Sequence, residues 1–250
     1  MRIISLVPSL TELLSDLGLH EEVVGITKFC VHPVSWFQSK IKVGGTKNVN
    51  LNKVALLRPD IIIANKEEND QTQIEALSQD FKVLLTDIKS LDDALAVITE
   101  IGILVSKVTE AQQLNLKILT AFQGITPLYP PIKSCYFIWR KPYMISGCDT
   151  FINDMMRYCG FENCFNNISR YPEVKLDEVV NSGARLILLS SEPYPFAAKH
   201  LQEFITQLPA SNIQLVDGEM FSWYGSRLLL APEYFKSLIR HIITNAHSRD

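Results

Sequence analysis

Two stretches of the sequence decide the fold: LNKVALLRPDIIIAN at residues 51–65 and LDEVVNSGARLILLS at residues 176–190. Each begins with apolar residues at helical spacing, passes through a turn, and ends in a short apolar run. The helix of the first stretch must end before Pro59. An apolar run of this kind is typical of a strand buried on both faces of a parallel sheet. The order helix, turn, buried strand and loop therefore occurs twice, which predicts two lobes of similar layout.

The flanking sequence extends the same pattern. Residues 3–7 predict a strand that runs directly into a helix at Pro8, where Ser9 and Glu12 have the spacing of a capping box. A short strand is expected at residues 23–26. Further strands are predicted at residues 82–85, 135–138 and 213–216. Alternating helices and strands favour a doubly wound sheet in each lobe, with ligand sites in the loops that follow the strands.

A long segment without proline separates the two halves. Residues 90–122 carry apolar side chains at helical spacing, which predicts one helix on the order of 50 Å long. A helix of this length suits a spine that joins two lobes. We therefore predict an α/β fold of two doubly wound, three-layer lobes, over residues 1–88 and 124–250, joined by a single backbone helix over residues 89–123. A ligand cleft is expected between the lobes.

Charge and hydropathy exclude several classes of protein. The 250 residues include 24 basic and 27 acidic side chains, a formal net charge of -3, so the chain lacks the basic character of a nucleic-acid-binding protein. No apolar run approaches the roughly eighteen residues that a membrane span needs. The chain opens with Met1 and Arg2 directly before the first predicted strand, so as given it has no signal peptide.

The cysteines form an odd set without a CxxC pair. This pattern argues against a disulfide framework and against a zinc ribbon, and it favours buried free thiols for most of them. The five are Cys30, Cys135, Cys148, Cys159 and Cys164.

Several motifs together resemble the class III periplasmic solute-binding proteins, the helical-backbone receptors for cobalamin, haem and ferric siderophores. They are RIISLVPSLTE at residues 2–12, VGG at 43–45, LLRPDI at 56–61, the block at 146–163, and GSRL at 225–228. The resemblance covers nearly the whole chain. The cobalamin receptors are the most similar subfamily, because YMISG at 143–147 and YPEV at 171–174 fall where that group has similar runs.

The resemblance implies a periplasmic receptor, expected to be a monomer, that clamps a small metal chelate between its lobes with little motion. A cytoplasmic location follows instead if Met1 is the native start. Such receptors dock on an ABC transporter permease through an acidic residue on each lobe. By position these residues are Asn52 and Asp177, so one of the two charges is replaced by an amide.

Side chains in the strand-end loops are the predicted ligand contacts. Lys66 and Glu67 follow the buried strand of the first lobe, and Glu192 follows the equivalent strand of the second. Trp223 and Tyr224 lie in a predicted loop, where they either stack on a flat macrocycle or pack between the lobes. The full predicted ligand-binding set is Phe29, His32, Thr46, Lys66, Glu67, Met144, Tyr171, Glu192, Trp223, Tyr224 and Arg227.

Two members of this set have a second interpretation. The planar guanidinium of Arg227 either pairs with carboxylate, amide or phosphate groups of a ligand, or ties its loop to the lobe. His32 lies near Cys30, and both side chains are competent metal donors, but an ordinary loop histidine is the alternative. The other histidines lack HxH or HxxxH spacing, so we predict no site for a free metal ion.

Sequence motifs of the common enzyme classes are missing. The chain has no GxxxxGKS/T, GxGxxG or GxSxG sequence. We predict a solute-binding protein of an ABC-type uptake system, with no catalytic residue and no cofactor of its own. The alternative is a cytoplasmic enzyme or accessory protein acting on a corrinoid or metal chelate, marked by a perturbed carboxylate at Glu67, Glu192 or Glu219. A third hypothesis is a structural or regulatory protein whose cleft is filled by side chains.

Overall fold

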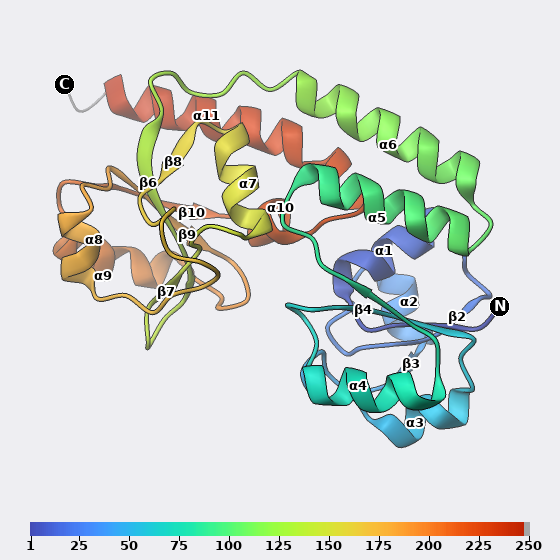
Figure 1. Cartoon of the computed structure of the whole chain (residues 1–250). Helices are drawn as coiled ribbons and strands as arrows, with labels where there is room; N and C mark the ends of the chain where they lie inside the picture. Colours follow the sequence, from blue (N-terminus) through green and yellow to red (C-terminus); the bar gives the residue numbers. More distant parts are fainter. Residues whose placement is uncertain (248–250) are drawn as a thin grey trace. The chain divides into compact units, whose positions relative to one another are not determined.

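The computed structural model of the chain describes residues 1–247. These residues form two compact units, each built around its own sheet (Figure 1). The first unit contains residues 1–88, 92–119 and 224–228, and the second contains residues 89–91, 120–223 and the described residues from 229 on. Within residues 1–247, no helix is both long and apolar enough to cross a membrane.

The first unit has a five-stranded sheet in which all neighbouring strands are parallel. In spatial order the strands are β3 (Ile41–Lys42), β2 (Val23–Ile26), β1 (Ile3–Ser5), β4 (Ile61–Asn65) and β5 (Val83–Thr86). The flanking helices are α1 (Pro8–Asp16), α2 (Val34–Ser39), α3 (Leu51–Leu57) and α4 (Gln71–Asp80). Ile62 and Ala64 pack with α3 and α4, while Ile61 and Ile63 are buried on the opposite face. Figure 1 shows α1 on that opposite side, which gives three layers.

The segment from α3 to β4 folds as its sequence predicts. The side chain of Asn50 accepts a hydrogen bond from the Lys53 N–H at 2.9 Å and so caps the start of α3. The helix ends at Leu57, because Arg58 takes a left-handed conformation at φ 45° and Pro59 cannot continue the helix. All five residues of β4 are buried. The predicted order of helix, turn, buried strand and loop is confirmed.

The start of α1 differs from its prediction. Pro8 occupies the first turn, Val7 is the N-cap residue, and no side chain caps the helix. Proline suits this place because its missing N–H would be unpaired there in any case. The carboxylate of Glu12 is instead engaged by the guanidinium of Arg227. The predicted capping box of Ser9 and Glu12 is therefore wrong.

The single helix predicted over residues 89–123 is also wrong. Two helices occupy this segment, α5 (Leu91–Leu104) and α6 (Val108–Gln123). Ser106 has a φ of 60° and breaks the helix between them. The chain then folds back, and the side-chain amide of Asn115 donates to the carbonyl of Leu95 at 2.9 Å. The pair is an antiparallel hairpin (Figure 1).

Close packing at the hairpin turn explains this difference. A Cβ placed on Gly102 would lie 2.4 Å from the Cβ of Ala111, so only glycine allows the two helices to approach so closely. The N–H of Lys107 donates to the Gly102 carbonyl at 2.7 Å and closes the end of α5. Each helix buries its own apolar stripe, and the two stripes follow each other in sequence. The helical spacing of apolar residues therefore continues across the turn, so the sequence pattern alone does not reveal where α5 ends and α6 begins.

The second unit repeats the α/β plan with a mixed sheet. Its strands run β10 (Asn212–Val216), β9 (Leu186–Ser190), β6 (Ile132–Trp139) and β7 (Met144–Ile145), and β8 (Phe161–Asn163) also pairs with β6. Only the pairing of β6 with β7 is antiparallel among these. The helices are α7 (Phe151–Tyr158), α8 (Leu176–Asn181), α9 (Ala198–Gln207), α10 (Gly218–Ser222) and α11 (Ala231–His247). The segment from α8 to β9 matches the one from α3 to β4, as predicted.

Aromatic side chains fill much of the second unit. Phe137 of β6 packs edge to face on Phe204 of α9, with ring centroids 5.1 Å apart. On the other face of β6, Tyr136 lies 5.1 Å from Phe221 of α10. Both faces of this sheet are therefore covered, α8 and α9 packing on one and α10 on the other.

Candidate functional site

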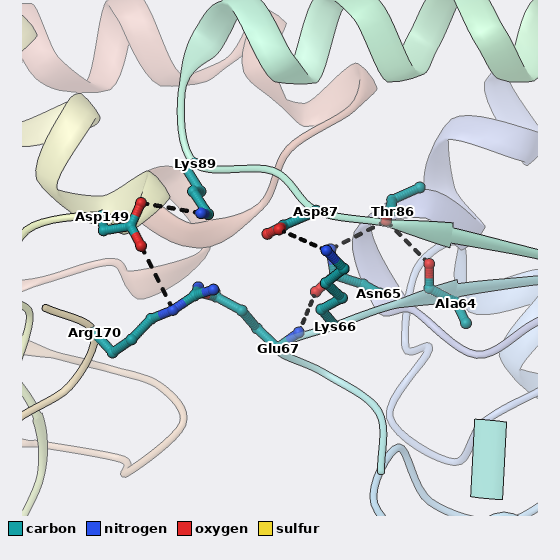
Figure 2. A network of polar contacts seen from close by, with 9 residues as sticks. All are labelled: Ala64, Asn65, Lys66, Glu67, Thr86, Asp87, Lys89, Asp149 and Arg170. Carbon is teal, nitrogen blue, oxygen red and sulfur yellow. Dashed lines mark hydrogen bonds and ion pairs between the residues drawn. The ribbon is translucent and has the colours of Figure 1, made fainter. Parts of the chain in front are cut away.

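The loop after β4 is closed by the side chain of Asn65. Its amide group donates to the hydroxyl of Thr86 at 3.1 Å, and its carbonyl oxygen accepts from the backbone N–H groups of Glu67 at 2.8 Å and Glu68 at 3.3 Å. The Lys66 N–H pairs with the carbonyl of Thr86 at 3.0 Å. Figure 2 shows these side chains at the ends of β4 and β5. They fix the direction of the loop where an open sheet binds ligands.

Asn69 joins this loop to its neighbours. Its carbonyl oxygen accepts from the Asn65 N–H at 2.8 Å, and its amide group donates to the carbonyls of Leu6 at 3.2 Å and Thr46 at 3.1 Å. Asn69 is buried, so each of these bonds satisfies a group that water cannot reach. The loops after β1, β3 and β4 are thereby held as one edge. Sequence reasoning missed Asn69, although an asparagine four residues beyond a strand-ending asparagine was a signal for a loop of this kind.

Charged groups stand on this fixed edge. Lys66, whose side chain is 53% exposed, forms an ion pair with Asp87 at 3.0 Å (Figure 2). The ammonium of Lys47 donates to the backbone carbonyls of Glu67 and Asn69. Burial raises the pKa of Glu68, although the charge of Lys47 partly opposes that rise. The predicted contact residues Lys66 and Glu67 thus lie side by side at the carboxyl end of β4.

A cavity of about 300 Å³ opens beside this loop. It is lined by Asn65, Lys66, Asn69, Gln71, Ile74, Glu75 and Leu85. This volume is at the low end of the range for small-molecule sites.

The other predicted residues of this edge lie in the loops after β2 and β3. Phe29 is 51% exposed, and its ring packs over Gly45, where an added Cβ would lie 3.2 Å from the ring. Thr46 is half-buried and its carbonyl accepts the bond from Asn69. His32 is half-buried in the loop before α2. Phe29 and Thr46 therefore share the sheet edge with Lys66.

Arg227 forms a two-pronged ion pair with Glu12 of α1. Its Nε donates at 2.7 Å and a terminal nitrogen at 2.6 Å, and the two side chains are only 10% and 17% exposed. Of the two interpretations of Arg227, the tie between its loop and the lobe is the one seen in the structure. Tyr224 precedes it in the same loop and is buried.

The loop after β9 in the second unit carries Glu192. The hydroxyl of Tyr136 donates to Ser190 at 3.0 Å, and Ser190 accepts from the Glu192 N–H at 3.3 Å. The carboxylate of Glu192 accepts from the hydroxyl of Ser222 at 2.5 Å and from the indole N–H of Trp223 at 2.8 Å. Burial raises the pKa of Tyr136 well above its ordinary value, so this phenol stays a proton donor. Trp223 is 7% exposed and orients Glu192.

A second group of charged residues lies before α7. Asp149 forms ion pairs with Lys89 at 3.1 Å and Arg170 at 3.8 Å (Figure 2). The backbones of residues 146–149 and 168–172 are hydrogen-bonded to each other, for example Gly147 N–H to the Arg170 carbonyl at 2.8 Å. Sequence reasoning missed this cluster, because its members come from three separate segments.

Met144 and Tyr171 belong to the same part of the second unit. Met144 in β7 pairs with Glu173 as an isolated antiparallel bridge, and the N–H of Ile145 donates to the Pro172 carbonyl at 3.1 Å. Both predicted residues are half-buried. Tyr171 directly follows Arg170, so the structure groups the predicted pair with the Asp149 cluster.

Asn52 and Asp177 occupy the same place in matching helices. Each is the second residue of its helix, α3 and α8 respectively, and each is exposed. Within the described residues, no group of three histidine, cysteine or acidic side chains is placed to hold a metal ion.

The sequence matches a known protein family over most of its length. A family model described as "Periplasmic binding protein" matches residues 3–213. The chain belongs to the periplasmic binding protein family. The resemblance inferred from the sequence motifs is therefore confirmed.

Individual relatives align with almost the whole length of this chain. The "Vitamin B12-binding protein" of Vibrio vulnificus (strain CMCP6) is 28% identical over 245 residues, which cover 93% of this chain and 87% of that protein. The solved structure of periplasmic vitamin B12 binding protein BtuF of Vibrio cholerae has a TM-score of 0.74 at 21% identity and covers 96% of each chain. Periplasmic haem-binding protein HutB of Vibrio cholerae has a TM-score of 0.80 at 20% identity, covering 96% of this chain and 98% of its own. The structural matches confirm the two-lobed α/β fold.

Proposed function

We propose that this protein binds a cobalamin-like or other metal-chelate ligand, namely a corrinoid, haem or a ferric siderophore, and delivers it to an ABC transporter permease. Its place of action is the periplasm. The ligand brings its own metal, so the protein needs no resident cofactor, and it releases the ligand chemically unchanged.

One observation carries the proposal. The chain matches the periplasmic binding protein family over residues 3–213, and the relative from Vibrio vulnificus that covers 93% of it is named for binding vitamin B12. Relatives of similar fold are named for binding haem. Vitamin B12 and haem are both large metal chelates with a broad ring and polar substituents, which supports this class of solute.

The chemistry of the first unit suits such a ligand. Its carboxyl edge offers the exposed ring of Phe29 for apolar contact and the exposed ammonium of Lys66 for amide, carboxylate or phosphate groups. The bonds of Asn65 and Asn69 hold the backbone of the loop that carries Lys66 in place, which lowers the entropy cost of binding.

In the second unit, the residues near Tyr171 likewise combine exposed charges with an aromatic ring. Lys89, Asp149 and Arg170 are all partly exposed. Lys89 and Arg170 present positively charged hydrogen-bond donors, and Asp149 presents a negatively charged acceptor. Tyr171 adds an aromatic ring. The proposed contacts are therefore aromatic rings surrounded by charged groups, as expected for a flat ring with polar side chains.

Thermal shift measurements with cyanocobalamin, haemin and a ferric siderophore test the proposal. At a ligand concentration 100 times its Kd, binding to the native state alone stabilises by about 2.7 kcal/mol, which raises the Tm by several degrees. We expect one of the three to produce this saturable shift, and the bound ligand to be recovered with an unchanged absorption spectrum. Absence of a shift with all three ligands would overturn the proposed function, and chemical conversion of the ligand would favour an enzyme.

A further inference from the structure

Two of the five cysteines meet in the second unit, although 28 residues separate them in the sequence. Strands β6 and β8 pair in parallel, with Ser134 opposite Asn163. Cys135 and Cys164 are the next residue on each segment, and the Cys164 N–H donates to the Ser134 carbonyl at 3.0 Å. Both side chains belong to one hydrophobic cluster, in which Cys164 packs against buried residues that include Cys135.

The strand register places Cys135 and Cys164 beside each other on neighbouring segments. Adjacent strands lie about 4.8 Å apart, which is within the range of Cα separations that a disulfide spans. The hydroxyl of Ser182, at the end of α8, lies 4.0 Å from the Cys135 sulfur. Both cysteines are free thiols, so the pair is in its reduced state.

Exposure and acidity distinguish the two members. Cys135 is fully buried, whereas Cys164 is partly exposed. The neighbouring Cys135 thiol is the main cause that lowers the pKa of Cys164 to about 7, and the hydroxyl of Ser182 and the charge of Lys133 act in the same direction against burial. The same contact with Cys164, together with burial, raises the pKa of Cys135. A low-pKa, accessible thiol beside a second thiol is the arrangement of reactive redox cysteines.

We propose that Cys135 and Cys164 are a thiol modification site that reacts with low-molecular-weight disulfides and closes to an intramolecular disulfide bond. The remaining cysteines lack this setting. Cys30 and Cys159 are buried, and burial raises the pKa of each thiol.

The reaction proceeds by two exchanges. The Cys164 thiolate attacks one sulfur of the external disulfide, the external S–S bond breaks, and one thiolate leaves, so that Cys164 carries a mixed disulfide. Cys164 then has no negative charge, which removes the contact that raised the pKa of Cys135. Cys135 loses its proton to solvent, its sulfur attacks that of Cys164, and the second external thiolate leaves. Two protein thiols are oxidised and one external disulfide is reduced to two thiols.

Peptide mapping after oxidation tests this site on the full chain. Reduced protein is incubated with glutathione disulfide, free thiols are alkylated, and the digest is analysed by mass spectrometry without reduction. We expect the intact mass before alkylation to be lower by two hydrogen atoms, and the digest to contain a cross-linked peptide pair with Cys135 and Cys164. Five alkylated cysteines, a stable glutathione adduct on the wild type, or a disulfide between other cysteines would overturn the proposal.

Variants separate the two roles. Cys135→Ala is expected to stop at a glutathione adduct on Cys164, and Cys164→Ser to leave Cys135 unmodified. Cys148→Ser removes a partly exposed cysteine outside the pair and is expected to react like the wild type. The closed bond should raise the Tm by about 5 °C or more, since it closes a loop of about 30 residues in the unfolded chain. This shift should be absent in Cys164→Ser, and its presence there would contradict the assignment.

Discussion

The loops that follow β4 and β9 begin with the same hydrogen bonds but differ in what they hold. In both, the last strand residue, Asn65 or Ser190, accepts from the N–H two residues further on. In both, the next residue pairs with the carbonyl that ends the neighbouring strand, at 3.0 Å each time. In the second loop, the carboxylate of Glu192 is held by Ser222 and Trp223, which have no counterpart among the described residues around Asn65. The two loops therefore share the same backbone hydrogen bonds but present different side chains.

The anchors of the two loops show the same contrast. Thr86 fixes Asn65 through one short side chain, and Asn69 adds bonds to two further loops. Tyr136 fixes Ser190 from inside an aromatic core. The first edge is held by amides and the second by a buried phenol, so the two should respond differently to substitution.

The largest expected effect concerns the arginine–glutamate pairs of the two units. Arg227→Ala leaves the mostly buried Glu12 without its guanidinium, and we expect the unfolding free energy to fall by about 3 kcal/mol. Arg140 pairs with Glu203 in the second unit, where the side chains are 24% and 23% exposed, so Arg140→Ala should cost only about 1 kcal/mol. Urea denaturation measures both. The exposed Arg240→Ala is the control, and equal losses for Arg227 and Arg140 would contradict the comparison.

The next largest effects are expected from substitution of Asn65 and Ser190, the residues that hold the loops after β4 and β9. Asn65→Ala leaves the two N–H groups at Glu67 and Glu68 unpaired, and we expect a loss of about 2 kcal/mol. Ser190→Ala removes one donor and the acceptor of the Tyr136 hydroxyl and of the Glu192 N–H, whose bond is long at 3.3 Å, for an expected loss of about 1 kcal/mol. Both are measured by denaturation against the exposed Asn48→Ala. A larger loss for Ser190 than for Asn65 would show that the first edge does not depend on its amides.

The proposed docking on a permease gives a test that compares Asn52 of α3 with Asp177 of α8. Asp177→Asn makes the second helix like the first, and we expect uptake of ligand by whole cells to fall about five-fold, as for the loss of one exposed charge pair, with the Kd for ligand unchanged. Asn52→Asp should raise uptake. Asp80→Asn, an exposed acid elsewhere, is the control. Unchanged uptake in both variants would remove these residues from the docking surface.

The pH dependence should have opposite signs in the two units. Burial raises the pKa of Glu68, so its ionised form weakens the fold, and Glu68→Gln should stabilise the protein at pH 7 but not below the normal glutamate pKa. Burial pushes the pKa of Glu203 upwards, but hydrogen bonds from Tyr143 and Arg140 outweigh it and hold the pKa below its usual value. Its ionised form therefore stabilises, and that contribution is lost as the pH falls through the lowered pKa.

Thermal unfolding of both variants between pH 3 and 8 measures these effects, which we expect to be the smallest of the series. Glu203→Gln should destabilise at neutral pH and approach the wild type in acid. If both variants shift the Tm in the same direction at pH 7, the environments of the two carboxylates are not those described.

Repeated local patterns made much of the fold predictable. The stretches at 51–65 and 176–190 carry their own turn residues and continuous apolar runs, so helix, turn and strand follow from local rules. The hairpin of α5 and α6 was missed because its cause is the contact of Gly102 with Ala111, which periodicity does not register. The pairing of Arg227 with Glu12 was missed for the same reason, since 215 positions separate the two residues.

The candidate site could be predicted only in part. Lys66, Glu67 and Glu192 could be placed in loops after buried strands from the sequence alone, and such a loop is a general location for ligand contacts. Asp149 and its partners Lys89 and Arg170 lie far apart in sequence, and no periodic or spacing signal connects them. Their grouping is a property of the folded chain.

The most direct test of the account is the Kd of the stabilising ligand, measured by isothermal titration calorimetry, for Tyr171→Ala and Tyr129→Ala. Tyr129 is 94% exposed and distant in sequence from every predicted contact, so it controls for the loss of a tyrosine. We predict about ten-fold weaker binding for Tyr171→Ala, from the lost aromatic contact, and wild-type affinity for Tyr129→Ala. Equal affinities for the two variants would contradict the assignment of Tyr171 to the ligand site.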